Sequence, residues 1–379
     1  MPSARFFATS PKGVESILAK ELKALGIENL KTAGGGVHFE GSMETLYRAN
    51  LWLRTANRVL MQLAEFPCPT PQILYQNARQ YRWNDWISAQ QTLAVDCNCR
   101  NSAINHSHFA ALKIKDAIVD QIRDSTGSRP NVDVRNPNVR VNAHIANDRC
   151  VLSLDSSGDG LHMRGYRRQA TEAPIRETLA AAIVELADWN SEGFFIDPMC
   201  GSGTILIEAA LKALNYAPGL LRVGSRSFGF QQWRGFDQQC WDEIVSEARN
   251  QVRERIPGRL LGYDLSRAAV GIAKNNVSTA GLTSHIRLSR GDVFNLHPSG
   301  HTGIIACNLP FGERSGDAEA LVPLYKGVGD ILKQRCTGYK AYLFSGNLKL
   351  VKSIGLRPSR RFAVQNGPIE CRLLEYKLY

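Results

Sequence analysis

The chain has 379 residues, of which 44% are hydrophobic, and this is enough for two or three domains with ordinary cores. A formal net charge of +11 favours a polyanionic partner such as a nucleic acid. No segment approaches the roughly 18 consecutive apolar residues of a membrane helix, and the N-terminus lacks the apolar stretch of a signal peptide. We therefore expect a cytoplasmic protein with no membrane partner.

The nine cysteines are scattered and form no Cys-x-x-Cys pair, which argues against a zinc ribbon or a disulfide framework. Cys97 and Cys99 fit a strand better than a ligand pair. His106 and His108 likewise fit the start of a helix. We expect no metal site.

Two small α+β units are predicted in the N-terminal half. In residues 1–60, short apolar stretches predict strands, and apolar residues at helical spacing predict two helices. In residues 61–163, Asn147-Asp148 separates two segments of alternating polarity and indicates a β-hairpin. The predicted strands cover residues 5–9, 37–40, 93–97, 139–145 and 150–154, and the predicted helices cover residues 11–25, 43–51 and 109–122.

From about residue 171, helices and strands alternate, which is typical of an α/β fold with a doubly wound, mostly parallel sheet. Proline is favoured at the first helical position, so a helix is predicted to begin at Pro174. A loop and one helix interrupt the pattern at residues 211–258. The predicted strands cover residues 194–196, 260–264, 286–289, 303–307 and 340–345.

A glycine-containing turn lies between the strand at 194–196 and a predicted helix at 205–211. Such turns bind nucleotide-like cofactors, because glycine lets a ligand approach the backbone and the helix N-terminus offers free N–H groups. The dinucleotide pattern Gly-x-Gly-x-x-Gly is absent, since residue 206 is leucine, and this disfavours a dehydrogenase. The candidate cofactor-binding residues of the turn are Asp197, Pro198, Cys200, Gly201, Ser202, Gly203 and Thr204.

Two more carboxylates follow predicted strands. Asp264 can accept both ribose hydroxyls of an adenosine, or it is only a helix N-cap. Asp292 can accept a hydrogen bond from an adenine amino group, or it is only a turn residue. We favour the cofactor contact for both.

Asn308-Leu309-Pro310-Phe311 suits the transfer of a methyl group to an amino nitrogen whose lone pair is delocalised into a ring. The Asn308 side-chain oxygen and the Leu309 carbonyl can each accept one N–H and so localise that lone pair. Pro310 fixes φ so that the two acceptors converge, and Phe311 offers a face on which an extracted base stacks. These four are the candidate catalytic residues; the alternative is a structural turn.

Two basic clusters are candidates for contact with nucleic acid. The first contains Arg164, Tyr166, Arg167 and Arg168, in which guanidinium and aromatic faces can meet phosphates and bases. The alternative for either cluster is a solvated basic surface. The second cluster contains Lys349, Lys352, Arg357, Arg360 and Arg361.

The motifs together resemble the class I S-adenosylmethionine-dependent methyltransferases. Within them, the chain is similar to RNA guanine-N2 methyltransferases with an N-terminal THUMP domain, and most of all to the bacterial large-subunit (23S) rRNA guanine-N2-methyltransferase family. The resemblance covers essentially the whole chain. It rests on the stretch from Val139 to Arg168, residues 173–180, the turn at 197–204, and Asn308-Leu309-Pro310-Phe311 with the three residues after it.

The resemblance implies a ferredoxin-like subdomain at 1–60, a THUMP RNA-binding domain at 61–163 and a Rossmann-like methyltransferase domain at 164–379. It also implies that Thr178 and Asp197 lie near the methionine end of S-adenosylmethionine. One departure is that the common motif has a second proline in place of Leu309 and often a tyrosine in place of Phe311. Leucine and phenylalanine occur in the guanine-N2 group, so they favour guanine over adenine.

The expected function is methylation of N2 of a guanine in RNA, with rRNA as the favoured substrate. Other acceptors stay open: tRNA, DNA adenine or a protein glutamine, although the accessory domain and basic charge argue against the last two. A non-catalytic RNA-binding or ribosome-assembly factor that retains the cofactor pocket is the alternative from another class. The sequence does not predict an oligomeric state.

Overall fold

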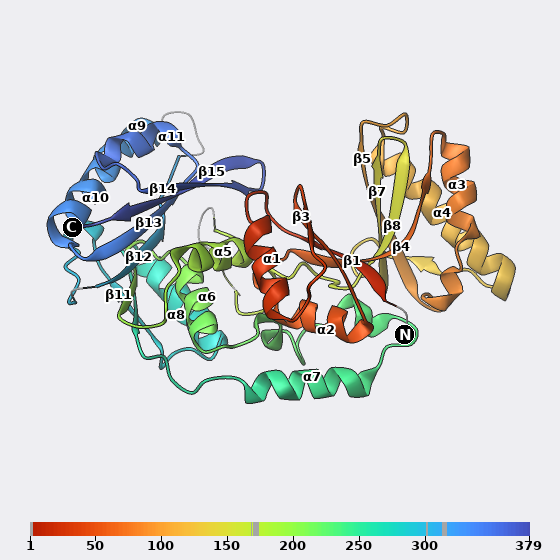
Figure 1. Ribbon diagram of the computed structural model, residues 1–379, viewed down its shortest axis with the longest axis horizontal. Helices are drawn as coiled ribbons and strands as arrows, with labels where there is room; N and C mark the ends of the chain where they lie inside the picture. Colours follow the sequence, from red (N-terminus) through yellow and green to blue (C-terminus); the bar gives the residue numbers. More distant parts are fainter. Residues whose placement is uncertain (1–2, 168, 170–173, 301, 313–316) are drawn as a thin grey trace.

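The computed structural model describes residues 3–167, 169, 174–300, 302–312 and 317–379. The chain forms two separate sheets, and the molecule is elongated, with the C-terminal sheet at one end (Figure 1). In Figure 1 the strands near the N-terminus lie in the middle and the helix pair of residues 71–126 lies at the opposite end.

The N-terminal sheet has eight strands in the order β2-β3-β1-β4-β8-β7-β5-β6. Its strands are β1 (Ala4–Thr9), β2 (Lys31–Ala33), β3 (Gly36–Gly41), β4 (Arg58–Pro67), β5 (Thr92–Arg100), β6 (Asn131–Val132), β7 (Val139–Ala146) and β8 (Arg149–Asp155). Its helices are α1 (Glu15–Ala24), α2 (Met43–Trp52), α3 (Pro71–Gln80) and α4 (Ser107–Thr126). β4 pairs with β1 on one side and with β8 on the other, so one continuous sheet joins the two N-terminal units.

Local signals in this half are confirmed. Asn147 and Asp148 have φ values of 51° and 56°, and they join the antiparallel strands β7 and β8 as a tight turn. Cys97 and Cys99 lie in β5, and His106 is the N-cap of α4, where its ring nitrogen accepts a hydrogen bond from the Phe109 N–H.

The C-terminal sheet has seven strands in the order β11-β10-β9-β12-β13-β15-β14. These strands are β9 (Phe194–Asp197), β10 (Arg259–Asp264), β11 (Ile286–Arg290), β12 (Gly303–Asn308), β13 (Tyr339–Ser345), β14 (Arg360–Asn366) and β15 (Ile369–Lys377). The helices of this half are α5 (Glu177–Ala187), α6 (Thr204–Ala213), α7 (Gln238–Asn250), α8 (Arg267–Thr279), α9 (Asp317–Ala320), α10 (Val322–Arg335) and α11 (Leu348–Val351). The five strands from β11 to β13 are parallel, whereas β15 and β14 pair antiparallel at one edge.

Helices cover both faces of the parallel strands, as in a doubly wound fold. Phe195 and Ile304 pack with apolar residues of α5 and α6. Their neighbours along the strands, Ile196 and Ile305, point to the other face and pack with α10. The α/β fold class is therefore confirmed. Two predicted helix starts were wrong. α5 begins at Glu177, because Arg176 still has extended dihedral angles and Pro174 lies outside the helix. α1 begins at Glu15 and not at residue 11, because Gly13 has a left-handed φ of +90°.

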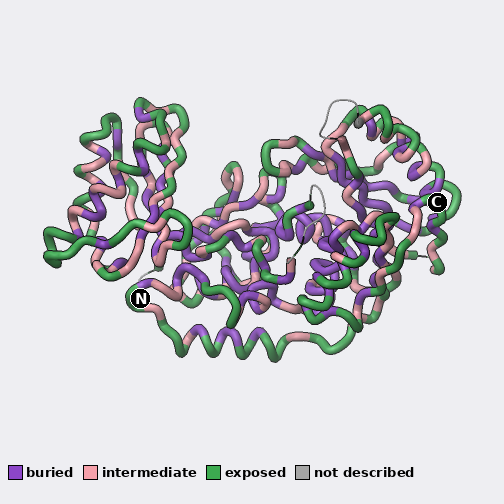
Figure 2. The backbone as a smooth tube through the Cα atoms, turned by 180° about the vertical axis from the view of Figure 1, so that it is seen from behind, coloured by how far each residue is buried: buried purple, intermediate pink, exposed green. Residues whose placement is uncertain are grey.

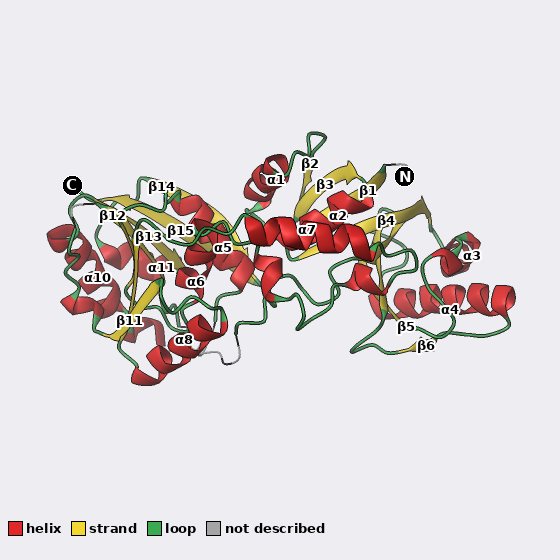
Figure 3. Cartoon of the chain, turned by 90° about the horizontal axis from the view of Figure 1, so that it is seen from below, coloured by secondary structure: helices red, strands yellow, loops and turns green. Residues whose placement is uncertain are grey.

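The segment between α6 and β10 leaves the C-terminal sheet and packs on the N-terminal half. α7 lies along α2 (Figure 3). Buried and exposed residues alternate along α7, so one side of this helix packs on the N-terminal half (Figure 2). Trp241 of α7 and Phe230 before it are buried against Tyr47 of α2. Aromatic residues from the C-terminal half of the sequence thus form part of the hydrophobic core of the N-terminal half.

A second contact between the two halves lies at the loop before α1. Val14 and Ile17 belong to the hydrophobic cluster that contains α5 and α6. The Gln365 N–H of β14 donates to the Lys12 carbonyl at 3.0 Å. Gly13 has a φ of +90°, and a Cβ atom there would lie 1.9 Å from the Ala363 carbonyl oxygen. Only glycine fits this crossing.

Candidate active site

Four predicted site residues lie at the carboxyl ends of neighbouring parallel strands. In sheet order they are Asp292 after β11, Asp264 in β10, Asp197 in β9 and Asn308 in β12. Strands lie about 4.8 Å apart, so the row spans about 15 Å. The chain order of the strands reverses between β9 and β12, and open α/β sheets bind ligands at such a switch point. The structure therefore places the cofactor candidates beside the catalytic candidates.

The glycine turn after β9 is held by neighbouring strands and helices. The Gly201 N–H donates to the Asp264 carboxylate at 2.9 Å, and the Cys200 N–H donates to the Tyr263 carbonyl at 2.8 Å. Gly201 and Gly203 have φ values of 53° and 80°, which favour glycine. The turn is fixed in place, and its backbone lies at the start of α6.

The other residues of the turn are mostly enclosed. Pro198 and Cys200 are buried, and the hydroxyls of Ser202 and Thr204 lie 3.1 Å apart in a hydrogen bond. The side-chain amide of Asn276 in α8 donates to the Ser202 carbonyl at 3.0 Å. These contacts fix the shape of the turn at the start of α6.

Asp197 is buried at the base of this turn and is 1% exposed. The pKa of its carboxyl is raised to about 8, mainly by burial. The Met199 N–H, 3.2 Å away, lowers this pKa in part, and the nearby Asp264 carboxylate raises it. A carboxyl in such surroundings is stabilised in its ionised form when a cation arrives. The position therefore suits the ammonium group of an amino-acid ligand.

Asp264 and Asp292 differ in their local roles. Ser266, not Asp264, is the N-cap of α8, and the Asp264 carboxylate accepts N–H groups of Ser266 and Gly201, each at 2.9 Å. Asp292 does cap a short 3-10 helix, where it accepts the Phe294 N–H at 2.9 Å. Asp292 can cap this helix and contact a cofactor at the same time, because a carboxylate that accepts one N–H has lone pairs left to accept another hydrogen bond.

Asn308 is the last residue of β12, and the loop after it carries the other catalytic candidates. Its side-chain oxygen is buried and makes no hydrogen bond within the part of the chain that the structure describes. Leu309 is fully buried, and its N–H donates to the Phe344 carbonyl at 2.9 Å, while Pro310 is exposed. An unpaired acceptor at a strand end is typical of a place where a ligand donates.

Thr178 makes a contact that the sequence did not predict. Its hydroxyl donates to the side-chain oxygen of Asn57, 2.9 Å away, in the loop before β4. The same loop is fixed by a bond from the Leu161 N–H to the Asn57 carbonyl at 2.8 Å. Asn57 stands in no recognisable motif, so only the three-dimensional structure reveals that the N-terminal half reaches the start of α5.

The proposed RNA-binding role of Arg164 and Tyr166 was wrong, because both side chains are buried. Both bond to Glu208 in the middle of α6: Arg164 through Nη2 at 3.2 Å and Tyr166 through its hydroxyl at 3.0 Å. Arg167 points inward too, since its guanidinium donates to the Thr204 hydroxyl at 2.9 Å and pairs with Glu177 at 3.2 Å.

Arg168, the last member of that cluster, lies outside the described residues. In the second basic cluster, Arg360 bonds to the buried carboxylate of Glu375 at 2.7 Å. Lys349, Lys352 and Arg361 are exposed, and their contact with nucleic acid stays a prediction.

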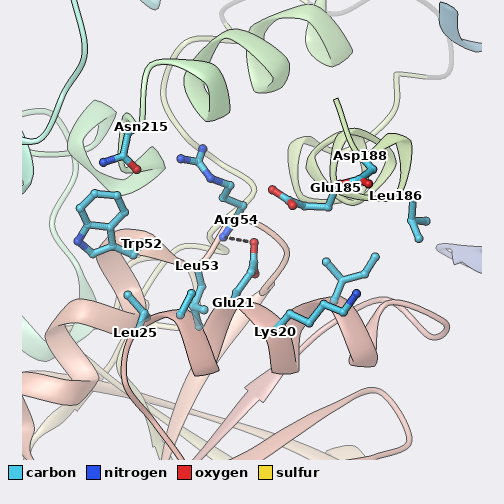
Figure 4. A pocket seen from close by; sticks show the side chains of 12 residues that line it. Lys20, Glu21, Leu25, Trp52, Leu53, Arg54, Glu185, Leu186, Asp188 and Asn215 are labelled. Carbon is cyan, nitrogen blue, oxygen red and sulfur yellow. Dashed lines mark hydrogen bonds between the residues drawn. The ribbon is translucent and has the colours of Figure 1, made fainter. Parts of the chain in front are cut away.

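A cavity of about 370 Å³ lies at the junction of α1, the end of α2 and the end of α5 (Figure 4). Glu21 of α1 accepts the Thr55 hydroxyl at 2.7 Å there, and burial raises its pKa to about 7. Glu185 and Asp188 line the cavity, so it lies about 10 to 15 Å along α5 from Thr178. The cavity belongs to the contact between the halves and not to the row of strand ends.

Within the described ranges, no group of three or more histidine, cysteine or acidic side chains is arranged to hold a metal ion. The helices described are also all too short or too polar to cross a bilayer.

Known proteins share the whole architecture. Family models match over residues 5–60 (RlmL ferredoxin-like domain), 70–155 (THUMP domain) and 164–375 (RMKL-like, methyltransferase domain). The putative RNA methyltransferase slr0064 of Synechocystis is 44% identical over 374 residues, which cover 99% of this chain and 97% of that protein.

The ribosomal RNA large subunit methyltransferase K/L of Methylococcus capsulatus is also 44% identical, over 386 residues. That match covers 100% of this chain and 52% of the relative, so the chain spans about half the length of the K/L relatives that it matches.

Solved structures agree on the fold. The crystal structure of SMU.472, a putative methyltransferase complexed with SAH, has a TM-score of 0.90 at 28% identity and covers 100% of this chain and 98% of its own. A predicted N6-adenine-specific DNA methylase from Listeria monocytogenes has a TM-score of 0.89 at 30% identity, over 100% of this chain and 97% of its own. The predicted resemblance is confirmed, and the chain belongs to the family of RMKL-like methyltransferases.

Proposed function

We propose that the protein transfers a methyl group from S-adenosylmethionine to the exocyclic N2 of a guanine in RNA, with 23S rRNA as the substrate. The observation that carries this proposal is the buried oxygen of Asn308, which has no hydrogen-bond partner among the residues that the structure describes and lies one strand away from the glycine turn. Support also comes from the THUMP match, the net charge of +11 and the names of the K/L relatives. A cytoplasmic location follows from this substrate.

The strand ends fit S-adenosylmethionine. Gly201 and Gly203 give the turn the left-handed backbone that lets it curve around a ligand. The buried Asp197 suits the ammonium group of the cofactor, and Asp264 and Asp292 offer carboxylate oxygens for the ribose and the adenine. Thr178 completes the methionine end through its place at the start of α5. When bound, this cofactor supplies a methyl group on a positively charged sulfur.

The chain's own residues then have to prepare the acceptor nitrogen. The Asn308 oxygen accepts one N–H of the guanine amino group, and the Leu309 carbonyl accepts the other. Holding both N–H groups away from the ring plane localises the lone pair and aims it at the methyl group. Phe311 supports the base by stacking. The nitrogen loses its proton after transfer, so no titrating general base is required beforehand.

Two other acceptors need to be separated from this proposal. A tRNA guanine presents the same nitrogen, so only the substrate differs. An adenine amino group has similar geometry, and the Listeria neighbour is described as a predicted N6-adenine-specific DNA methylase. Leu309 and Phe311 favour guanine through the resemblance described above.

The alternative from another class is a non-catalytic assembly factor. Such a protein would bind the cofactor and RNA but transfer no methyl group.

The proposal is tested by incubating the purified protein with labelled S-adenosylmethionine and unmodified transcripts of 23S rRNA, tRNA and duplex DNA. We expect label in 23S rRNA only, and about a hundredfold less of it in the same reaction time with Asn308→Ala. Label in tRNA alone or in DNA alone would overturn the proposal that 23S rRNA is the substrate. Cofactor binding without any transfer would support the assembly factor.

A further inference from the structure

A buried hydrogen-bond network holds the loop that carries the catalytic candidates. The residues of this network have no role in the methyl transfer proposed above. Tyr325 of α10 and Ser345 at the end of β13 are both 0% exposed. The Tyr325 hydroxyl lies 3.1 Å from the Pro310 carbonyl, to which it donates, and 2.8 Å from the Ser345 hydroxyl. The network therefore ends on the backbone of the catalytic loop.

The same network reaches the next residue of the loop through Asn347. The Asn347 N–H donates to the Ser345 hydroxyl at 3.1 Å, and its side-chain amide donates to the Phe311 carbonyl at 3.4 Å. The Phe311 ring lies against Gly346, where an added Cβ would come within 3.0 Å of the ring. Two consecutive carbonyls and the stacking ring are thus fixed from one side.

We propose that Tyr325 is a positioning residue for methyl transfer: its hydroxyl holds the Pro310 carbonyl and so fixes the direction of the Asn308 and Leu309 acceptors. The bond fixes the rigid peptide plane between Pro310 and Phe311. Because the proline ring also fixes φ at residue 310, the preceding plane, which carries the Leu309 carbonyl, is held through it. The bond also occupies the Pro310 carbonyl, which then does not compete with Leu309 for the base. Beside these bonds, the Asn308 oxygen has no partner in the described part of the chain.

The hydroxyl is suited to a permanent donor role. Burial raises the pKa of Tyr325 to about 12, so it keeps its proton throughout the neutral range. Its ring packs in the same hydrophobic cluster as Leu309, which is fully buried. Removing only the hydroxyl therefore leaves the packing in place and tests the bond.

The inference rests on the proposed function and is tested with Tyr325→Phe. Tyr376→Phe is the matched control, because Tyr376 is also buried and its hydroxyl has no partner among the described residues. For Tyr325→Phe we expect kcat to fall about tenfold, which is what the loss of one positioning hydrogen bond costs. The Kd for S-adenosylmethionine and the KM for RNA should stay as in the natural protein, and Tyr376→Phe should change nothing.

A second readout does not depend on activity. Amide hydrogen exchange at Leu309 and Phe311 should be faster in Tyr325→Phe than in Tyr376→Phe, because the loop loses its anchor. Should Tyr325→Phe fail to fold, Ser345→Ala removes the neighbouring bond and is expected to lower kcat and to speed the same exchange. If the natural protein methylates no RNA, the proposed function fails and the exchange rates alone decide this inference. The inference is overturned if Tyr325→Phe leaves the amide exchange at Leu309 and Phe311 unchanged. It is also overturned if the natural protein is active and Tyr325→Phe leaves kcat unchanged.

Discussion

At the scale of single residues, the feature that connects structure to chemistry is the buried oxygen of Asn308, which is unpaired within the described ranges. A buried acceptor without a partner costs about 1–3 kcal/mol of stability, so its presence indicates a role other than folding. Asn308→Ala should therefore lower the transfer rate by about 10²- to 10³-fold, the cost of losing one stabilising group at a reaction centre. Its melting temperature should be unchanged or slightly higher.

Single-turnover methylation, calorimetry with S-adenosylmethionine and thermal unfolding measure these effects separately. Cofactor affinity should stay within about twofold, because Asn308 is assigned to the base. A parallel loss of affinity and stability would mean that the residue is structural.

Asp197 gives a prediction about pH. In the folded protein its pKa is about 8, against an ordinary value of 3.8, so folding in the free protein favours the protonated form. The contribution of this carboxyl to stability is therefore greatest below about pH 4 and is lost as the pH rises towards 8, by at most about 1.4 kcal/mol per pH unit.

Asp197→Asn should remove this slope. Urea unfolding of both proteins between about pH 5 and pH 9 measures it, and the variant should gain stability relative to the natural protein up to about pH 8 and then level off. A constant difference across that range would show that Asp197 is already ionised at neutral pH.

At the scale of elements, α6 is held along its whole length. Arg167 bonds to Thr204 at its first residue, Arg164 pairs with Glu208 in its middle, and the Arg54 guanidinium donates to the Tyr216 carbonyl, at 2.9 Å, just beyond its end. Because α6 begins at the glycine turn, these contacts also fix the candidate cofactor-binding residues of that turn.

Glu208→Gln should destabilise the fold by about 3–5 kcal/mol, because it leaves the buried Arg164 cation without its partner. The matched control is Glu185→Gln, which removes a half-buried pair with Lys212 of α6. Since both of these side chains still reach water, the change should cost only about 1 kcal/mol. Chemical denaturation measures both, and equal losses would contradict the structural role of the buried pair.

Features that depend on residues close together in the sequence could be predicted, whereas contacts between residues far apart in the sequence could not. The glycine turn, the hairpin at Asn147 and the strands of the parallel sheet depend on neighbouring residues, and the structure contains all of them. The burial of Arg164 depends on Glu208, 44 positions away, and nothing near either residue reveals the pair. For the same reason, the packing of Trp241 on Tyr47 was beyond prediction.

At the scale of the whole molecule, the N-terminal and C-terminal halves are interleaved. α7 completes the N-terminal core, and α1 packs on α5 at the side of the C-terminal sheet. The Asn57–Thr178 bond joins the N-terminal half directly to the cofactor side of α5. The N-terminal sheet is therefore held in a fixed relation to the strand ends that carry the candidate site residues.

Gly13→Ala tests this rigid junction. A methyl group there would meet the Ala363 carbonyl, whereas the same change at Gly26, which has a similar φ of +81°, would meet nothing within 4 Å. Gly13→Ala should therefore cost about 1–3 kcal/mol more than Gly26→Ala. Calorimetric unfolding measures both, and equal melting temperatures would show that the two halves separate freely at this point.

The most direct test of the central claim is the chemical identity of the methylated nucleoside. The purified protein is incubated with S-adenosylmethionine and unmodified 23S rRNA, and the RNA is digested and analysed by mass spectrometry. We expect N2-methylguanosine, and about a hundredfold less of it in the same reaction time when Asn308→Ala is used. N6-methyladenosine, or no methylated nucleoside, would contradict the central claim.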